Sequence, residues 1–492
     1  MNELPKGWKV AALGDICTQP VQRTPSDDES FIYIDIASVD RTLKVVSKPQ
    51  QLLGAEAPSR ARKVVNTGDV IVSMTRPNLN AVALIHEQHN NCIASTGFDV
   101  LKPNEIDSRW IFAAVRSAQF VEAMCEKVQG ALYPAVNSAD IRKHKIGVPP
   151  RAEQTRIAQK LDELLAQVDT LKARVDAIPA LLKRFRQSVL AAAVSGRLTE
   201  EWRTENTNLN KASTELLIEI EQERKLAFQA DAERVGKNKK YKNPVTIAIE
   251  GLPKIPNSWA WVSVDSLASK VVDGVHKKPD YKSAGIPFIT VKNLTATNGI
   301  SFTDTKFVSP EDHEEFYKRA NPENGDLLIS KDGTLGVIRQ VKTNAEFSIF
   351  VSVALVKPAL RSTSDYLEIA FKSPQVQAQM VGVGSGLQHI HLTDLKQDAI
   401  PLPPKEEQTE IVRRVEQLFA FADQLEAKVA SAKSRIDLLT QSILAKAFRG
   451  ELVPQDPNDE PASVLLERIK AQRAAAPKAK RGRKAATSDD SC

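Results

Sequence analysis

One stretch of the sequence occurs twice and decides how the chain is organised. It reads Ile146-Gly147-Val148-Pro149-Pro150-Arg151-Ala152-Glu153-Gln154-Thr155, and 254 positions later (146 to 400) it returns as Ile400-Pro401-Leu402-Pro403-Pro404-Lys405-Glu406-Glu407-Gln408-Thr409. Outward from it, residues 187–191 match 441–445 at the same offset, and residues 68–73 match 325–330. Because these matches keep their order along the chain, the sequence predicts two tandem copies of one unit.

The two copies resemble each other unevenly. After each Pro-Pro pair they align without a gap for about fifty residues, whereas the preceding ~140 residues agree only at framework points such as Trp8 with Trp259. We therefore expect each unit to combine a constant scaffold with a variable domain. The predicted boundaries are 1–148 and 252–402 for the variable domains, 149–202 and 403–452 for the scaffold helices, 203–251 for a charged connector with a short helix, and 453–492 for a short helix and a disordered basic tail.

Both scaffold segments place apolar residues at alternating steps of four and three, which is the pattern of a coiled coil. Helices of about forty residues would form a rod near 60 Å long, and a pseudo-two-fold axis would make them antiparallel. The alternative is that each helix covers only its own domain. Pro179 is expected to bend or break the first helix, and Gly196 and Gly450 stand where C-caps would be. The expected seam consists of Ile157, Leu161, Leu164, Val168, Leu171, Val175, Ile411, Val415, Leu418, Leu425, Val429 and Ile436.

Pairs of adjacent apolar residues, such as Leu438-Leu439, widen each stripe beyond a two-stranded seam. Either helices of another protein or this chain's own variable domains would cover that second face.

The variable domains are predicted to be mixed α/β. Strands are expected at 31–36, 70–73, 81–85, 287–291, 327–329 and 350–356, and helices at 108–127 and 364–381. The expected fold class is therefore α+β, with two homologous mixed α/β domains separated by two long antiparallel coiled-coil helices in a pseudo-two-fold internal repeat.

Loops of the variable domains concentrate Arg, Lys, Asn, Thr, Gln and His. Lys and Arg suit phosphate anchoring, Arg also reads guanine edges, and Asn or Gln reads adenine. Surface loops are polar in most proteins, so each cluster is a hypothesis of DNA binding. The candidates are Arg60, Arg62, Lys63, Arg76, Asn78, Lys277, Lys278, Lys292, Asn293, Lys331, Thr334, Gln388, His389 and His391.

Composition narrows the class of protein. Lys plus Arg number 67 against 61 Asp plus Glu, and this mild excess permits a nucleic-acid partner without requiring one. The four scattered cysteines favour neither a disulfide framework nor a zinc cluster, and they fit a reducing compartment. The start resembles no secretion signal and no apolar run reaches membrane length, so a cytoplasmic protein without a membrane partner is expected.

Catalytic and cofactor motifs are missing from the sequence. It contains no GxxxxGK[ST], and the glycines at 382–386 lack GxGxxG spacing. It also contains no Asn-Pro-Pro-Tyr or Asp-Pro-Pro-Tyr. His389 and His391 have no nearby carboxylate or Cys to complete a metal site. We expect no catalytic residue and no metal.

Two diverged domains, each closed by a Pro-Pro-x-x-Glu-Gln-x-x-Ile helix, resemble the specificity subunit of type I restriction–modification systems. The matching residues are 148–157 and 402–411, the Gly-Asp strands, and the run at 385–395, and the resemblance extends to about residue 473. The segment 130–141 agrees with that run only in part.

The resemblance implies a DNA-binding subunit without catalytic residues of its own. Each variable domain would be a target recognition domain for one half of a split, asymmetric site in double-stranded DNA, and the helices would set the distance between halves. It also implies two methylation subunits docked on the helices and, in assemblies that cleave, two restriction subunits. S-adenosylmethionine, ATP and Mg would then be bound by those partners and no cofactor by this chain. The rival interpretation is a coiled-coil adaptor whose globular domains bind proteins.

Overall fold

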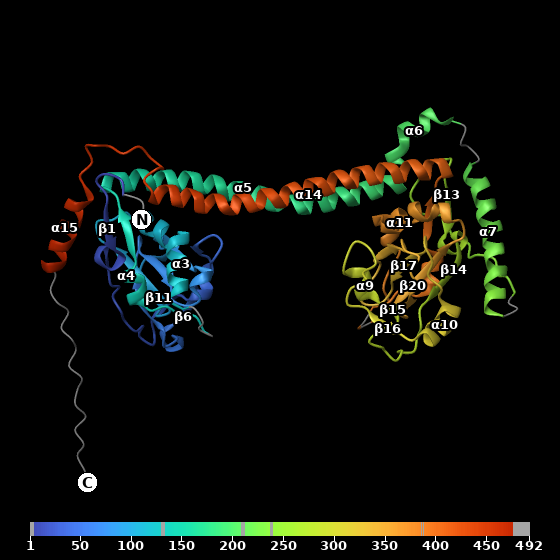
Figure 1. Cartoon of the computed structure of the whole chain (residues 1–492), viewed down its shortest axis with the longest axis horizontal. Coiled ribbons are helices and arrows are strands. Elements are labelled where there is room, and N and C mark those ends of the chain that lie inside the picture. The colour runs from blue at the N-terminus through green and yellow to red at the C-terminus, as the bar shows by residue number, and fades with distance from the viewer. Residues whose placement is uncertain are drawn as a thin grey trace, which may run out of the picture. The chain divides into compact units, whose positions relative to one another are not determined.

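The computed structural model describes residues 4–128, 133–207, 212–236, 240–384, 386 and 388–475. It divides into two compact units, one made of Met1–Asp176 with Ala430–Cys492 and the other of Ala177–Val429. Each unit combines one mixed α/β domain with part of the two long helices, α5 (Arg151–Val194) and α14 (Lys405–Phe448) (Figure 1). The expected fold class is confirmed. Of the short helix and basic tail expected at 453–492, residues 476–492 lie outside the described residues.

The two long helices pack antiparallel in both units. In the first unit Lys172 pairs with Asp437 at 2.9 Å and Asp176 with Lys433 at 2.6 Å, so numbers rise along one helix as they fall along the other. In the second unit Arg186 contacts Asp423 at 2.6 Å. These exposed ion pairs contribute little stability each, but they report the register.

Pro179 does not break α5, which is one helix of 44 residues. A proline inside a helix costs about 3 kcal/mol, because it removes one backbone hydrogen bond and crowds the preceding turn. Val175 and Leu182 are buried on either side of it, and their burial offsets that cost. Gly196 and Gly450 both have positive φ after the helices end, as expected of C-caps.

The apolar stripe of each helix is buried unevenly. Leu164, Leu418, Leu425 and Val429 are partly buried, but Leu171 is 43% exposed and so does not lie within a closed seam. A straight helix has 3.6 residues per turn, so a strict 3.5-residue pattern drifts away from the contact line. The buried members of the expected seam are Ile157, Leu161, Val168, Val175, Ile411, Val415 and Ile436.

The first domain contains three principal sheets. Strand β1 (Lys9–Ala12) pairs antiparallel with β12 (Lys145–Val148), the strand that leads into Pro149-Pro150. A four-stranded sheet has the order β2 (Cys17–Thr18), β11 (Phe98–Pro103), β8 (Val70–Ser73) and β9 (Val82–Leu84). A second has the order β6 (Gln50–Leu53), β3 (Ser30–Ile34), β10 (Cys92–Ser95) and β7 (Ala61–Val65).

The second domain repeats this plan. Strand β13 (Ala260–Ser263) pairs antiparallel with β21 (Ala399–Leu402). One sheet has the order β14 (Ala268–Asp273), β20 (Val353–Pro358), β17 (Leu327–Ser330) and β18 (Ile338–Gln340). Another has the order β16 (Lys306–Val308), β15 (Ile286–Ile289) and β19 (Ser348–Ile349). Its core continues into the long helices through Val189, Leu190, Ile411 and Val415.

Several predicted elements require correction. The helix expected at 108–127 is two helices, α2 (Ser108–Arg116) and α3 (Ala118–Glu126), because the Ser117 hydroxyl caps the second by accepting from Phe120 N–H. The helix expected at 364–381 divides in the same way at Ser373, into α11 (Ser364–Lys372) and α12 (Pro374–Gln377). The strand expected at 287–291 ends at Ile289, and that expected at 350–356 begins at Val353.

The remaining helices flank the domains. They are α1 (Leu13–Ile16), α4 (Ser138–Lys143), α6 (Glu200–Glu205), α8 (Val264–Leu267), α9 (Val291–Thr295), α10 (Pro310–Arg319), α13 (Leu392–Gln397) and α15 (Ala462–Ala475). The helix of the connector, α7 (Ala212–Val235), has 24 residues and is not the short helix expected there. No helix within the described part of the chain is both long and apolar enough to span a membrane.

The duplicated motif joins each domain to its long helix. In the first unit, Trp8 Nε1–H donates to Glu153 at 3.0 Å, and Gln154 accepts from Asp107 N–H while its amide donates to Pro149 O. In the second unit, Trp259 Nε1–H donates to Glu407 at 2.8 Å. The Glu and Gln of the motif are therefore buried structural groups.

Candidate nucleic-acid interface

The turn after β17 gathers several candidates of the second unit. Lys331 N–H donates to Ser352 O at 2.9 Å, and Lys331 O accepts from Ile390 N–H at 2.8 Å. Gly333 N–H donates to Gln388 O, and the rings of His389 and His391 lie 4.4 Å apart. Lys331, Thr334, Gln388, His389 and His391 are thus brought together, although more than fifty residues separate the two segments.

A buried carboxylate, that of Asp273, contacts the basic side chains near this turn. Asp273, the last residue of β14, accepts hydrogen bonds from the Arg319 guanidinium; His276 Nε2 lies 3.1 Å from its Oδ1 and Lys331 Nζ 3.4 Å from its Oδ2. Burial by itself would raise the pKa of Asp273, but the hydrogen bonds from Arg319 and His276 outweigh it, and the pKa lies below its ordinary value. The carboxylate is ionised at neutral pH and holds its basic neighbours.

The other candidates of the second unit lie in different settings. Lys277 and Lys278 are exposed directly after His276, and Lys292 is exposed 3.9 Å from Asp304. Asn293 requires correction, because it is only 4% exposed. Its side-chain carbonyl accepts from Thr290 N–H at 2.9 Å and its side-chain amide donates to Ser301 O at 2.9 Å, so the buried side chain shapes a turn.

In the first unit the candidates collect around residues 96–98. Thr96 N–H donates to Arg60 O, and Lys63 Nζ donates to Phe98 O at 2.5 Å. Gly97 O accepts from Met74 N–H, which places the 74–80 loop with Arg76 and Asn78 at the same turn. Arg60, Arg76 and Asn78 are exposed, whereas Arg62 and Lys63 are half-buried. Burial lowers the pKa of Lys63, with Asp99 opposing the effect.

The loops after the two Gly-Asp strands have matching partners. Val136 N–H donates to Met74 O at 2.8 Å in the first unit, as Ile390 N–H donates to Lys331 O in the second. Residues 134–136 therefore occupy the position of 388–390, a correspondence that the partial sequence match left open. The backbone frame is shared, whereas the side chains on it differ.

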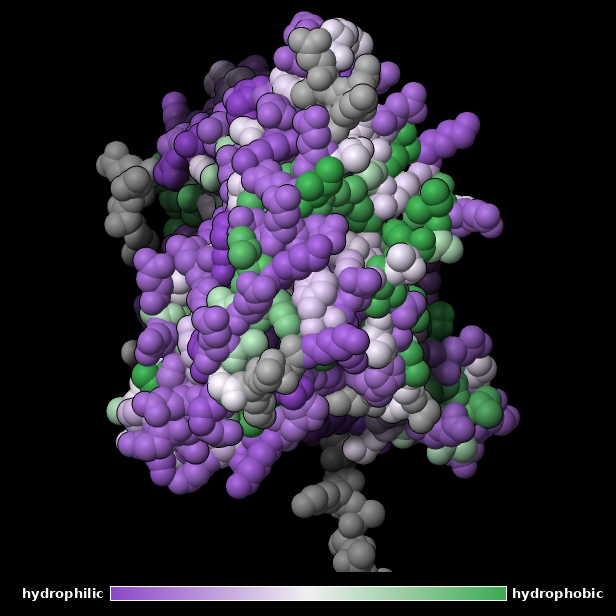
Figure 2. Space-filling view, turned by 90° about the vertical axis from the view of Figure 1, so that its right-hand side faces the viewer, coloured by the Kyte–Doolittle hydropathy of each residue, from purple (hydrophilic) through white to green (hydrophobic). Residues whose placement is uncertain are grey.

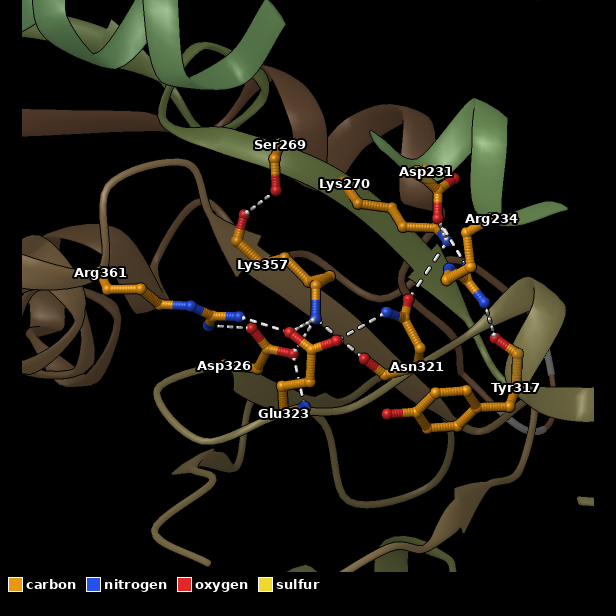
Figure 3. Close-up of polar contacts among 10 residues, drawn as sticks. All are labelled: Asp231, Arg234, Ser269, Lys270, Tyr317, Asn321, Glu323, Asp326, Lys357 and Arg361. Carbon is orange, nitrogen blue, oxygen red and sulfur yellow. Dashed lines mark hydrogen bonds and ion pairs between the residues drawn. The ribbon is translucent and has the colours of Figure 1, made fainter. Parts of the chain in front are cut away.

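The aspartate of each Gly-Asp strand has a structural role. Asp326 is fully buried, lies 2.7 Å from Lys357 Nζ, and also pairs with Arg361 (Figure 3). Burial raises its pKa despite these two cations. In the first unit Asp69 is similarly buried and lies 3.6 Å from Lys102 Nζ. Glu323 also lies 3.1 Å from both Lys357 and Arg361, so two carboxylates face these two cations. These pairs fix the strands.

A cleft of about 520 Å³ lies beside this network, between α7 and the second domain. Its cations contact its own carboxylates. Lys270 and Arg234 reach Asp231 (Figure 3). Arg224 lies 3.6 Å from Asp265. The surface that carries α7 is mainly hydrophilic, with separate hydrophobic patches (Figure 2). We therefore interpret the cleft as the packing interface between α7 and the second domain.

Sequence reasoning missed Arg319 and Asp273. They are 46 residues apart and carry no motif, so only the fold places them together. No group of three or more His, Cys, Asp or Glu is positioned to hold a metal ion among the residues that the structure describes.

Comparison with known proteins identifies the family. The model of the type I restriction modification DNA specificity domain matches residues 5–180 and 267–431. The chain belongs to the type I restriction-modification specificity subunits. It is 31% identical to the EcoKI specificity subunit of Escherichia coli strain K12, over 98% of this chain and 99% of that protein. It is 36% identical to the EcoBI specificity subunit of Escherichia coli, over 71% of this chain and 69% of that protein.

Solved structures agree. The HsdS subunit from Thermoanaerobacter tengcongensis matches with a TM-score of 0.54 and 25% identity, covering 91% of this chain and 98% of that one. A chain from a study of complex assembly and conformational transition of the type I R-M system matches with a TM-score of 0.62 and 25% identity, covering 92% of this chain and all of that one. This specificity subunit is the non-catalytic, DNA-specifying component of such a system.

Proposed function

We propose that this specificity subunit reads a split, asymmetric sequence in double-stranded DNA, with residues 1–148 and 252–402 as the two target recognition domains. One observation supports the proposal: in each unit, backbone hydrogen bonds bring residues with basic or amide side chains from distant segments to one turn. They include Arg60 and Arg76 in the first unit, and Lys331 and Gln388 in the second. Because the two sets differ in chemistry, the two half-sites should differ in sequence.

The chemistry of the two turns suits DNA. The exposed side chains of Arg60 and Arg76 are of the kind that anchors phosphates or reads guanine, and the exposed Gln388 presents an amide of the kind that reads adenine. The Lys331 side chain is 11% exposed. Asn78 offers the same amide in the first unit. The adaptor alternative predicts binding that does not depend on phosphate charge, so salt dependence separates the two interpretations.

The helices would set the spacing between the half-sites. Helices of 44 residues are about 66 Å long, which exceeds one turn of DNA. Inserting one heptad into α5 after Asp176 and one into α14 after Ala432 keeps the seam in register and should lengthen the permitted spacer by ~3 base pairs. An unchanged spacer would exclude the spacing role.

The long helices would also dock two methylation subunits and, where the system cleaves DNA, two restriction subunits. Apolar side chains that remain exposed on them support this: Leu438 is 71% exposed in the first unit and Phe421 is exposed in the second. S-adenosylmethionine, ATP and Mg would be held by those partners.

The proposal is tested by mapping methylated adenines in a genome whose cell expresses this chain with its methylation subunits. The expected result is one bipartite motif with unlike halves. Arg76→Ala should weaken discrimination in one half only, and Lys331→Ala in the other only. A continuous motif, or equal loss in both halves from either variant, would contradict the assignment.

A further inference from the structure

We propose that Asp273 is a positioning residue for sequence discrimination in the second unit. It would hold Arg319 and Lys331 in one orientation and keep them from binding phosphates of any sequence. This inference rests on the proposed DNA-reading function and adds Arg319 as a DNA-contacting group.

The carboxylate is held firmly by its surroundings. Asp273 is 4% exposed at the end of a paired strand, and Arg319 Nε–H also donates to its backbone carbonyl at 3.1 Å. The next residue, Gly274, packs so closely that an added Cβ would lie 2.0 Å from Ile349 O. Asp273 therefore provides a fixed anchor. Of the two side chains that it holds, Arg319 is half exposed, whereas Lys331 is only 11% exposed.

The charges at this position do not cancel. A single carboxylate faces two permanent cations, Arg319 and Lys331, and a histidine, His276. One positive charge remains for DNA even with neutral His276. Half of the Arg319 side chain is exposed, so part of its guanidinium fork stays free while one edge is fixed.

This arrangement favours discrimination over raw affinity. A basic side chain that is held in one orientation loses little conformational entropy when it contacts a base. A mobile basic side chain can bind any nearby phosphate, whatever the sequence. A carboxylate beside the DNA also repels phosphates, which penalises binding that lacks base contacts. Removing the charge of Asp273 should therefore strengthen non-specific binding and weaken the preference for the cognate site.

The test compares the assembled methylation complex containing wild-type chain, Asp273→Asn or Asp280→Asn. Asp280 is an exposed carboxylate of the same domain paired with Lys282, so its variant removes the same charge without touching the anchor. Dissociation constants are measured for the cognate duplex and for one with a scrambled second half-site, from low to high salt.

For Asp273→Asn we expect the ratio of cognate to scrambled affinity to fall about tenfold, and the salt dependence of scrambled binding to steepen by about one phosphate contact. Asp280→Asn should leave the ratio within about twofold of wild type. Arg319→Gln removes the other partner of the same ion pair, at an exposed position, and should also lower the ratio of cognate to scrambled affinity. If Asp273→Asn unfolds under the conditions of the assay, Arg319→Gln still tests the inference.

An unchanged ratio in both Asp273→Asn and Arg319→Gln, with folded protein, would overturn the inference. A wild-type complex that does not distinguish the two duplexes would instead overturn the proposed function. The two failures are therefore distinguishable.

Discussion

The indole nitrogen of Trp259 donates to the carboxylate of Glu407 at 2.8 Å, wholly inside the second unit. Glu407 also accepts from Thr199 Oγ1 at 2.6 Å and pairs with Arg203. The buried carboxylate of Glu407 thus joins three segments: the start of the second domain, the first turn of α14 and the segment after α5. The first unit repeats only part of this, because Glu153 Oε1 has no hydrogen-bond partner among the described residues.

We expect Glu407→Ala to destabilise the second unit by ~3 kcal/mol, since it leaves Arg203 and the indole without their buried partner. Glu406→Ala, one residue earlier and exposed, should cost less than about 0.5 kcal/mol. Urea unfolding of the full chain measures both free energies of unfolding. Equal effects would show that the burial of Glu407 has no energetic weight.

Asp398 should make stability depend on pH. It follows α13, its Oδ2 has no partner among the described residues, and burial raises its pKa to about 7, with Asp394 adding to the effect. The folded state thus binds a proton more tightly than the unfolded chain, and stability is lost as pH rises from about 4 to about 7.

Asp398→Asn removes the loss of stability that ionisation of Asp398 causes. The variant should be more stable than wild type at pH 8 by at most about 4 kcal/mol, and nearly equal to it at pH 4. Thermal unfolding over this range provides the measurement, with Asp280→Asn as the exposed control. A difference that is the same at both pH values would contradict the titration of Asp398.

Arg224 is expected to hold α7 on the second domain. Its guanidinium donates to Asp265 O and Ala268 O, each at 3.1 Å, and to the Tyr241 hydroxyl at 2.5 Å. Arg224→Ala should speed amide hydrogen exchange in α7 about tenfold or more while the strands of the domain stay protected. Lys225→Ala, on the exposed side of the same helix, should leave exchange unchanged. Equal acceleration of exchange in α7 and in the strands would mean that α7 does not open independently of the domain.

Leu438 should matter for docking and not for folding. Leu438→Asp places a charge on the exposed face of α14 and is expected to weaken capture of methylation subunits at least tenfold. Leu438→Met keeps the apolar area and should bind as wild type does. Native mass spectrometry of the reconstituted complex reports the stoichiometry. If the aspartate variant retains both subunits, docking uses another surface.

The sequence predicted the repeat, the long helices and the Gly-Asp strands, because those features recur at fixed spacing. It did not predict the break at Ser117, since a serine cap is decided by one hydroxyl and its local geometry. It placed Asn293 among base-reading residues because an amide in a loop looks the same whether free or used in a turn. The Asp273–Arg319 pair joins segments that only tertiary structure brings together.

The chain segments that form the two units impose an order on synthesis. The second unit is one continuous run, Ala177–Val429, and can complete its contacts once that run has left the ribosome. The first unit needs both the beginning of the chain and the segment from Ala430 onward. The domain made first therefore completes its contacts last, and until the part of α14 from Ala430 to Phe448 has been made, the apolar stripe of α5 in the first unit lacks its partner helix.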